Sequence, residues 1–239
     1  MRLTRDLVQE RKSRYLLDHY MNLHAAMVGV AIGVAGLAAA NIFTFQGPDA
    51  ELPLRVMLLC VSLLITANIY MGLMVGGLIL PGTAPLGLDF LLPFMIGMLE
   101  FVLFGFLVIK PENPQIAAAS IKGWLIAFVM LALLAAVAIM WARQHMRPGQ
   151  YTDDQTAMVS EYRQRLSKDI RGAIFAATIG SVGLGFQYFS TWSWFHYIWP
   201  PILIAGLLTG IAAHQKTASK IAAHLDHKRA PDTDSRGEN

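Results

Sequence analysis

The stretch that decides the fold is residues 54–109, LRVMLLCVSLLITANIYMGLMVGGLILPGTAPLGLDFLLPFMIGMLEFVLFGFLVI. It holds two long apolar runs, 54–80 and 86–109, on either side of a short Pro-Gly turn. A bilayer core takes about 20 apolar residues per helix, so each run is long enough to cross it once. The second run carries two acids, Asp89 and Glu100, and an acid inside a membrane span is a functional-site hypothesis by default.

Four further apolar runs surround this pair, at 24–45, 121–142, 172–190 and 195–214. Hydrophobic residues make up 55% of the chain and charged residues only 15%, against about 25% in soluble domains. The runs are continuous, whereas strands of a membrane barrel would alternate between apolar and polar residues. The sequence therefore predicts an all-α polytopic membrane protein with six transmembrane helices.

The basic residues predict the orientation of these helices. Most of the 19 Lys and Arg residues lie in three segments, 1–23, 143–171 and 215–239. Six spans place all three segments on one face of the membrane, and an excess of Lys and Arg marks the cytoplasmic face. We therefore expect a multi-pass protein of the inner membrane with both termini in the cytoplasm. Topology accounts for the pI of about 9.1, so the lipid bilayer, and not nucleic acid, is the expected partner.

The same boundaries divide the chain into five parts. These are a cytoplasmic amphipathic leader at 1–23, a four-helix transmembrane unit at 24–142, a basic amphipathic cytoplasmic helix at 143–171, a transmembrane hairpin at 172–214, and a cytoplasmic helical extension with a disordered tail at 215–239.

A pair of tryptophans on the fourth span and an apolar face on the basic helix predict how these two parts lie relative to the membrane. Trp124 and Trp141 are about 25 Å apart along the fourth span, which is typical of interfacial anchors on a helix that faces lipid. In the basic helix, apolar residues recur every four positions, as in Met158, Tyr162 and Leu166. We expect this face to rest on anionic headgroups or to contact another subunit.

Small residues indicate where helices approach closely, because association in lipid relies on packing. Gly29 and Gly33 serve either packing inside this chain or a homo-oligomer contact, and the sequence leaves both open. Asn68 shares one face of the second span with two glycines, and the tight turn that follows predicts that this face packs on the third span. Asn41 is placed to bond a neighbouring helix. The predicted packing positions are Gly29, Gly33, Gly72, Gly76 and Gly97.

Glu100 is the strongest candidate for function. It lies more than two turns deeper than Asp89, which is close to the mouth of the span. Three interpretations stay open: a neutral acid bonded to a polar group on the second span, part of a hydrated path for protons or cations, or a contact to a polar ligand or lipid headgroup. The residues predicted for such a site are Glu100, Asp89, Asn68, Thr66 and Tyr70.

Residues 158–216 resemble the bacterial two-transmembrane domain, found alone or attached to sensor kinases and regulators. The resemblance is carried by a basic helix, a small-residue span, Trp194-Phe195, Trp199-Pro200, Gly206 and His214. The histidine lies about one turn later than in that family, and Pro201 is an extra proline. The resemblance implies a membrane-embedded module that associates with itself.

No HExxH, GxSxG or P-loop motif occurs in the sequence, and one cysteine excludes a CxxC pair. We therefore expect no catalytic residues, no metal and no cofactor. The main hypothesis is a non-enzymatic membrane module that associates with itself or with partner membrane proteins. The alternative is a small oligomeric channel or transporter for protons or cations that uses Glu100.

Overall fold

The computed structural model describes residues 5–44, 51–79, 87–110, 114–146, 153–189 and 197–229. Within these ranges, the side chains of 5–21, 23, 24, 77–79, 87–90, 114, 145, 153–158, 188, 189, 222 and 224–229 lie outside the description. The described residues form six helices: α1 (Arg5–Phe43), α2 (Glu51–Ile79), α3 (Gly87–Val108), α4 (Pro114–His145), α5 (Asp153–Phe189) and α6 (Trp199–Arg229). The all-α prediction is confirmed.

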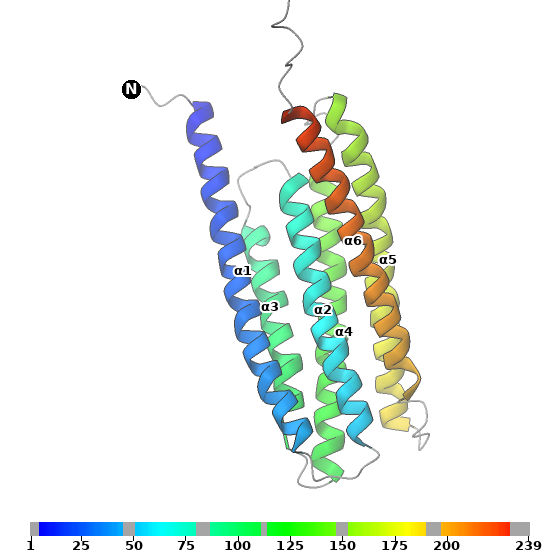
Figure 1. Ribbon diagram of the computed structural model, residues 1–239. Helices are drawn as coiled ribbons and strands as arrows, with labels where there is room; N and C mark the ends of the chain where they lie inside the picture. The colour runs from blue at the N-terminus through cyan, green and yellow to red at the C-terminus, as the bar shows by residue number, and fades with distance from the viewer. Residues whose placement is uncertain are drawn as a thin grey trace, which may run out of the picture.

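The six helices run alternately up and down in one elongated bundle (Figure 1). The start of α1 and the end of α6 therefore lie at the same end of the bundle, which is called the terminal end below. The helix α3 packs mainly against α1 and α4, α2 packs mainly against α6, and α4 packs most extensively against α5. Because α2 and α6 both start at the end opposite to the termini, they are parallel to each other.

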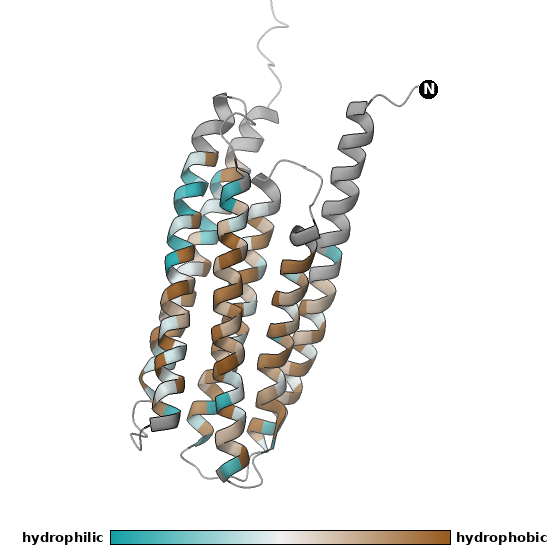
Figure 2. Cartoon of the chain, turned by 180° about the vertical axis from the view of Figure 1, so that it is seen from behind, coloured by the Kyte–Doolittle hydropathy of each residue, from teal (hydrophilic) through white to brown (hydrophobic). Residues whose placement is uncertain are grey.

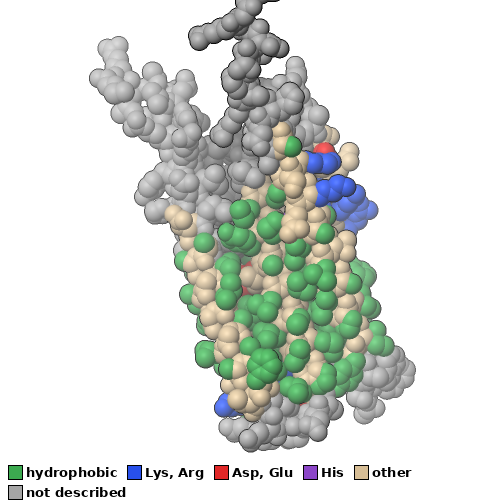
Figure 3. Space-filling view, viewed as in Figure 1, with side chains coloured by type: hydrophobic (Ala, Val, Ile, Leu, Met, Phe, Trp, Pro, Cys, Tyr) green, Lys and Arg blue, Asp and Glu red, His purple; other side chains and the backbone are tan. Residues whose placement is uncertain are grey.

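Four helical segments of the described chain are long and apolar enough to cross a membrane. They are Ala25–Phe43, Glu51–Gly76, Leu91–Val108 and Gln115–Gln144. Figure 2 shows these segments in brown, while hydrophilic residues gather toward the terminal end of α5 and α6. Figure 3 shows a broad hydrophobic surface with Lys and Arg gathered near that same end. The protein is thus a multi-pass membrane protein in its architecture, and the remaining two spans and the orientation stay predictions.

The centre of the bundle is built around Trp124 of α4, which is fully buried. Its indole Nε1 donates a hydrogen bond of 3.0 Å to Ser62 Oγ on α2. Its ring stacks on Phe128 and lies 5.9 Å from the ring of Trp199 on α6. Trp124 is therefore not the lipid-facing anchor that was predicted, because its side chain joins α4 to α2 and α6. The opposite face of α4 is exposed as predicted, with Met130 at 54% and Leu133 at 51%.

The basic segment and the fifth apolar run form one unbroken helix, α5. Its buried face at the terminal end is Val159, Tyr162 and Leu166, which pack against Val75 of α2 and Ile221 of α6. We expected this face on headgroups or another subunit. Instead it packs within the chain, because α2 and α6 extend far enough to cover it.

The leader and the first span likewise form one helix, α1, although the side chains of 5–21 lie outside the description. Near the other end of α1, Asn41 Nδ2 donates a hydrogen bond of 2.6 Å to the backbone oxygen of Val108 on α3. The prediction that Asn41 bonds a neighbouring helix is confirmed.

Candidate intramembrane polar site

Glu100 of α3 lies inside the bundle, with an exposed fraction of 0%. The residues one turn away on the same face are buried as well, including Ile96, Gly97 and Phe104. A Cβ built on Gly97 would lie 2.5 Å from Met27 Cε of α1, and Phe104 packs in a cluster with alanines of α1. Helix packing therefore turns the carboxyl group inward, away from lipid.

Neither carboxyl oxygen of Glu100 has a hydrogen-bond partner among the described residues. The interpretation that Glu100 is bonded to a polar residue of the second span is therefore not borne out there. Two of the predicted partners of Glu100 also have a buried oxygen without a hydrogen bond. Thr66 Oγ1 and Asn68 Oδ1 have no hydrogen-bond partner among the described residues. Tyr70 is half-buried on α2. An unpaired polar group in an apolar interior costs about 2 kcal/mol or more, so these four oxygen atoms call for an explanation.

Asp89 lies in the first turn of α3, but its side chain is outside the described residues. Whether it shares a path with Glu100 stays a prediction.

The face of α2 that carries Asn68 packs on α6 and not on α3, so that prediction is wrong. A Cβ on Gly210 of α6 would lie 3.0 Å from Asn68 Oδ1, and a Cβ on Gly72 would lie 3.5 Å from His214 Cε1. Gly76 is buried one turn further along α2. The short turn makes α2 and α3 antiparallel but does not choose which face they share. The flat surface of Gly210 admits the Asn68 amide, and α6 takes this position.

Arg55 forms a second polar group that the sequence analysis missed. Its exposed fraction is 2%, at the end of the bundle opposite to the termini. Its guanidinium donates to Ser120 Oγ at 3.0 Å and to the backbone oxygen of Ile109 at 3.4 Å, and Glu51 lies 3.9 Å away. The sequence feature that could have indicated this group is the spacing of Glu51 and Arg55, since oppositely charged residues four positions apart lie side by side on a helix. Ile109 is about 14 Å beyond Glu100 along α3, so Arg55 is too far away to act as its counter-charge.

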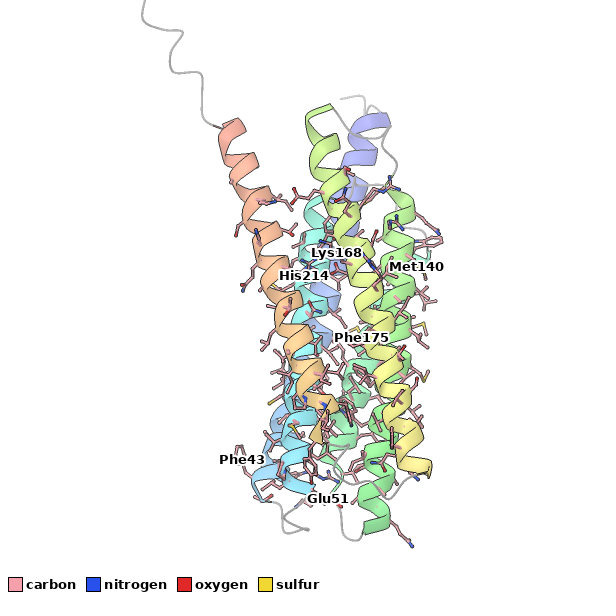
Figure 4. All side chains as sticks on the ribbon, turned by 90° about the vertical axis from the view of Figure 1, so that its right-hand side faces the viewer. Phe43, Glu51, Met140, Lys168, Phe175 and His214 are labelled. Atoms are coloured by element: carbon pink, nitrogen blue, oxygen red, sulfur yellow. The ribbon has the colours of Figure 1, made fainter. Side chains whose placement is uncertain are left out.

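A third polar group lies toward the terminal end, where α2, α5 and α6 meet. Arg165 donates from Nε to Asp169 Oδ1 at 3.1 Å and from Nη2 to the backbone oxygen of Gly210 at 3.0 Å. Tyr162 is buried beside this pair, and burial, reinforced by the Asp169 carboxylate, raises the pKa of its phenol. His214 lies at about the level of Lys168, far from the end marked by Phe43 and Glu51 (Figure 4).

The first glycine stripe faces away from the bundle. A Cβ on Gly29, Gly33 or Gly36 would meet no atom of the described chain within 4 Å. Ala25 and Ala40 on the same face are exposed as well. The sequence left two alternatives open for Gly29 and Gly33, packing inside the chain or a homo-oligomer contact. Packing inside the chain is not found among the described residues.

Comparisons with known protein families, with curated proteins and with solved structures gave no match to this chain. The resemblance of residues 158–216 to the two-transmembrane domain therefore gains no support from them. In the described residues, no three His, Cys, Asp or Glu side chains are grouped in a way that would hold a metal ion.

Proposed function

We propose that this chain is a non-enzymatic module of the bacterial inner membrane that associates laterally with other membrane proteins, and first with a second copy of itself, through α1. The observation that carries this proposal is the open glycine face of α1. That face contains Gly29, Gly33 and Gly36, and no atom of the described chain lies within 4 Å of a Cβ built at any of them.

The position of α1 supports the choice of this helix. It lies at the edge of the bundle, with its buried face, Ala31, Ala35 and Ala38, turned toward the other helices (Figure 1). Lipid tails are as apolar as the helix, so association depends on how closely two backbones approach. A face of glycine and alanine permits the closest approach.

A second copy is the simplest occupant of this face. Two α1 helices bring identical small-residue faces together, as the self-complementary interface of a two-fold dimer requires. Glycines four residues apart are also the pattern on which membrane helices commonly cross.

We expect the double variant Gly29→Leu and Gly33→Leu to raise the dissociation constant of the dimer in lipid about tenfold or more, because leucine side chains hold the backbones apart. Energy transfer between donor- and acceptor-labelled chains, followed while the protein is diluted with lipid in liposomes, measures this constant. The control is Gly206→Leu, which adds one leucine at an open glycine of α6. Equal transfer in the double variant and the wild type, or none in the wild type, would refute the proposal.

A second candidate function is a path for protons or cations that includes Glu100, Asp89, Asn68, Thr66 and Tyr70. Three of these residues, Glu100, Thr66 and Asn68, have a buried oxygen without a partner in the described chain, and this favours the candidate. Buried acids inside membrane bundles commonly mark such paths.

For this second candidate we expect Glu100→Gln to abolish proton or monovalent-cation flux into liposomes, because the amide cannot release a proton or carry a negative charge. The measurement compares wild type and variant at matched incorporation across a range of pH. Glu161→Gln, which alters an exposed acid of α5, serves as the control. Absence of flux in the wild type at every pH would rule out this candidate and leave the association proposal standing.

A further inference from the structure

Two glycine contacts fix how α4 and α5 lie beside each other. A Cβ on Gly180 of α5 would lie 2.7 Å from Phe128 of α4, and a Cβ on Gly183 would lie 3.4 Å from Leu125. The two helices are antiparallel (Figure 1), so each residue of α5 toward the terminal end is matched by one residue further along α4. The contacts therefore give the level of any residue of one helix on the other.

Arg171 is exposed on α5 at a level where the neighbouring surface is apolar. By the spacing of the glycine contacts it is level with Val137 of α4, which is 47% exposed. Figure 4 shows the same match nearer the terminal end, where Lys168 and Met140 lie at about the same level. Ile174, one turn further from that end on α5, is 50% exposed. An arginine in such a position keeps its charge near water by extending along the apolar surface.

The Arg171 side chain does turn toward the terminal end. Its Nε donates a hydrogen bond of 3.3 Å to the backbone oxygen of Ser167, which is one helical turn nearer that end. Its Nη1 and Nη2 have no hydrogen-bond partner among the described residues. Arginine binds phosphate through two N–H groups side by side, and these two nitrogens are available for such a contact.

Two more arginines lie close to the level of Ser167. Arg143 of α4 is exposed, and it lies five turns beyond Leu125 on the row of α4 that faces α5. Along the axis it is about 3 Å from the level of Ser167. Arg163 is half-buried one turn before Ser167, whose hydroxyl donates a hydrogen bond of 3.0 Å to its backbone oxygen. The axes of packed helices are about 8–10 Å apart, a distance that long side chains from both helices can span to meet one phosphate.

The neighbouring acids are already paired with other basic residues. Asp169 pairs with Arg165, and Glu161 pairs with Lys220. Within the part of the chain that the structure describes, neither acid forms an ion pair with any of the three arginines. The three therefore leave a positive charge at the end of an exposed apolar surface.

We propose that an anionic phospholipid binds the seam between α4 and α5. Its phosphate lies on the three arginines, and one acyl chain lies along the exposed apolar residues that follow them away from the terminal end. An anion joined to an apolar chain is the ligand that matches both parts of this surface. Phosphatidylcholine matches it less well, because its choline cancels the charge of its phosphate. The residues that form this arginine surface are Arg143, Arg163, Arg171, Val137, Met140 and Ile174.

This proposal is independent of association through α1 and of conduction through Glu100, since the arginine surface includes neither. It assigns a lipid of defined charge to one place on the protein, beyond the general contact that every membrane helix makes with the bilayer.

Quenching by brominated lipids tests the site in the full chain, reconstituted in phosphatidylcholine liposomes. A fluorophore is attached at Leu133→Cys in a Cys60→Ser background. Leu133 is 51% exposed and lies about 15 Å from Arg143 along α4, beside the expected acyl chain. We expect half-maximal quenching at about a tenfold lower mole fraction of brominated phosphatidylglycerol than of brominated phosphatidylcholine. Each basic residue beside an anionic headgroup contributes about fivefold in affinity.

Arg143→Gln combined with Arg171→Gln should remove this preference, whereas the two Arg→Lys changes at the same positions should keep most of it. The matched control is Lys110→Gln combined with Lys216→Gln, which removes the same charge from exposed lysines outside the arginine surface. A fluorophore on the native Cys60, which is exposed on α2, gives the reference, and there the two lipids should quench alike.

Equal quenching of the Leu133→Cys label by both lipids in the otherwise unchanged chain would overturn the proposal. Retention of the preference in the double Arg→Gln variant would overturn it as well. Inorganic phosphate added to the buffer should leave the preference unchanged, because a free anion lacks the acyl chain. Loss of the preference in phosphate would show that the arginines bind a soluble anion and not a lipid.

Discussion

Trp124→Ala is expected to lower the free energy of unfolding by about 4 kcal/mol, the loss typical of deleting a large buried aromatic side chain. Trp124 is fully buried, stacks on Phe128 with centroids 5.2 Å apart and packs against Trp199. Its indole also donates to Ser62 of α2. All of these contacts are made by the Trp124 side chain. Its replacement by alanine therefore removes packing from α2, α4 and α6 at the same place.

Unfolding of the purified chain in mixed detergent micelles measures this loss. Trp124→Phe should be intermediate, because it keeps an aromatic ring while Ser62 loses its donor. The control is Met130→Ala on the same helix, where the methionine is 54% exposed and faces lipid. An equal loss of unfolding free energy in Trp124→Ala and Met130→Ala would mean that Trp124 does not hold α2, α4 and α6 together.

Glu100→Met is expected to act in the opposite direction and to raise the free energy of unfolding by about 2 kcal/mol. The carboxyl group is fully buried, and both of its oxygens lack a partner among the described residues. Methionine has a similar length, fills the same space and places no polar atom there. The expected increase in the free energy of unfolding is therefore the desolvation penalty of the buried carboxyl group in the wild type.

The same unfolding measurement checks this prediction. Glu161→Met is the control, since Glu161 is an exposed acid paired with Lys220 and its loss should change stability by less than about 1 kcal/mol. A fall in stability in Glu100→Met would show that the carboxyl is bonded to a group outside the described residues. A rise, combined with a loss of flux in Glu100→Gln, would identify Glu100 as an acid that is retained for function at the expense of stability.

The sequence by itself determined the apolar part of each helix and, for the central pair, the approximate ends as well. The predicted runs 54–80 and 86–109 correspond to α2 (Glu51–Ile79) and α3 (Gly87–Val108). Apolar length and the positions of proline and glycine are local properties, so they can be read without knowing the neighbours of a helix. The same local reading identified Glu100, because an acid in an apolar run stands out wherever the helix is placed.

Only the tertiary structure decided which face of each helix meets which neighbour. Asn68 packs on α6, Trp124 lies in the centre, and Arg55 is buried at the end of α2. The glycine face of α1 that includes Gly29 has no partner in the described chain. The physical reason is that lipid tails and a protein interior are equally apolar. Hydropathy therefore locates a helix in the membrane but does not distinguish its lipid-facing side from its packed side, and that distinction arises only when all six helices assemble.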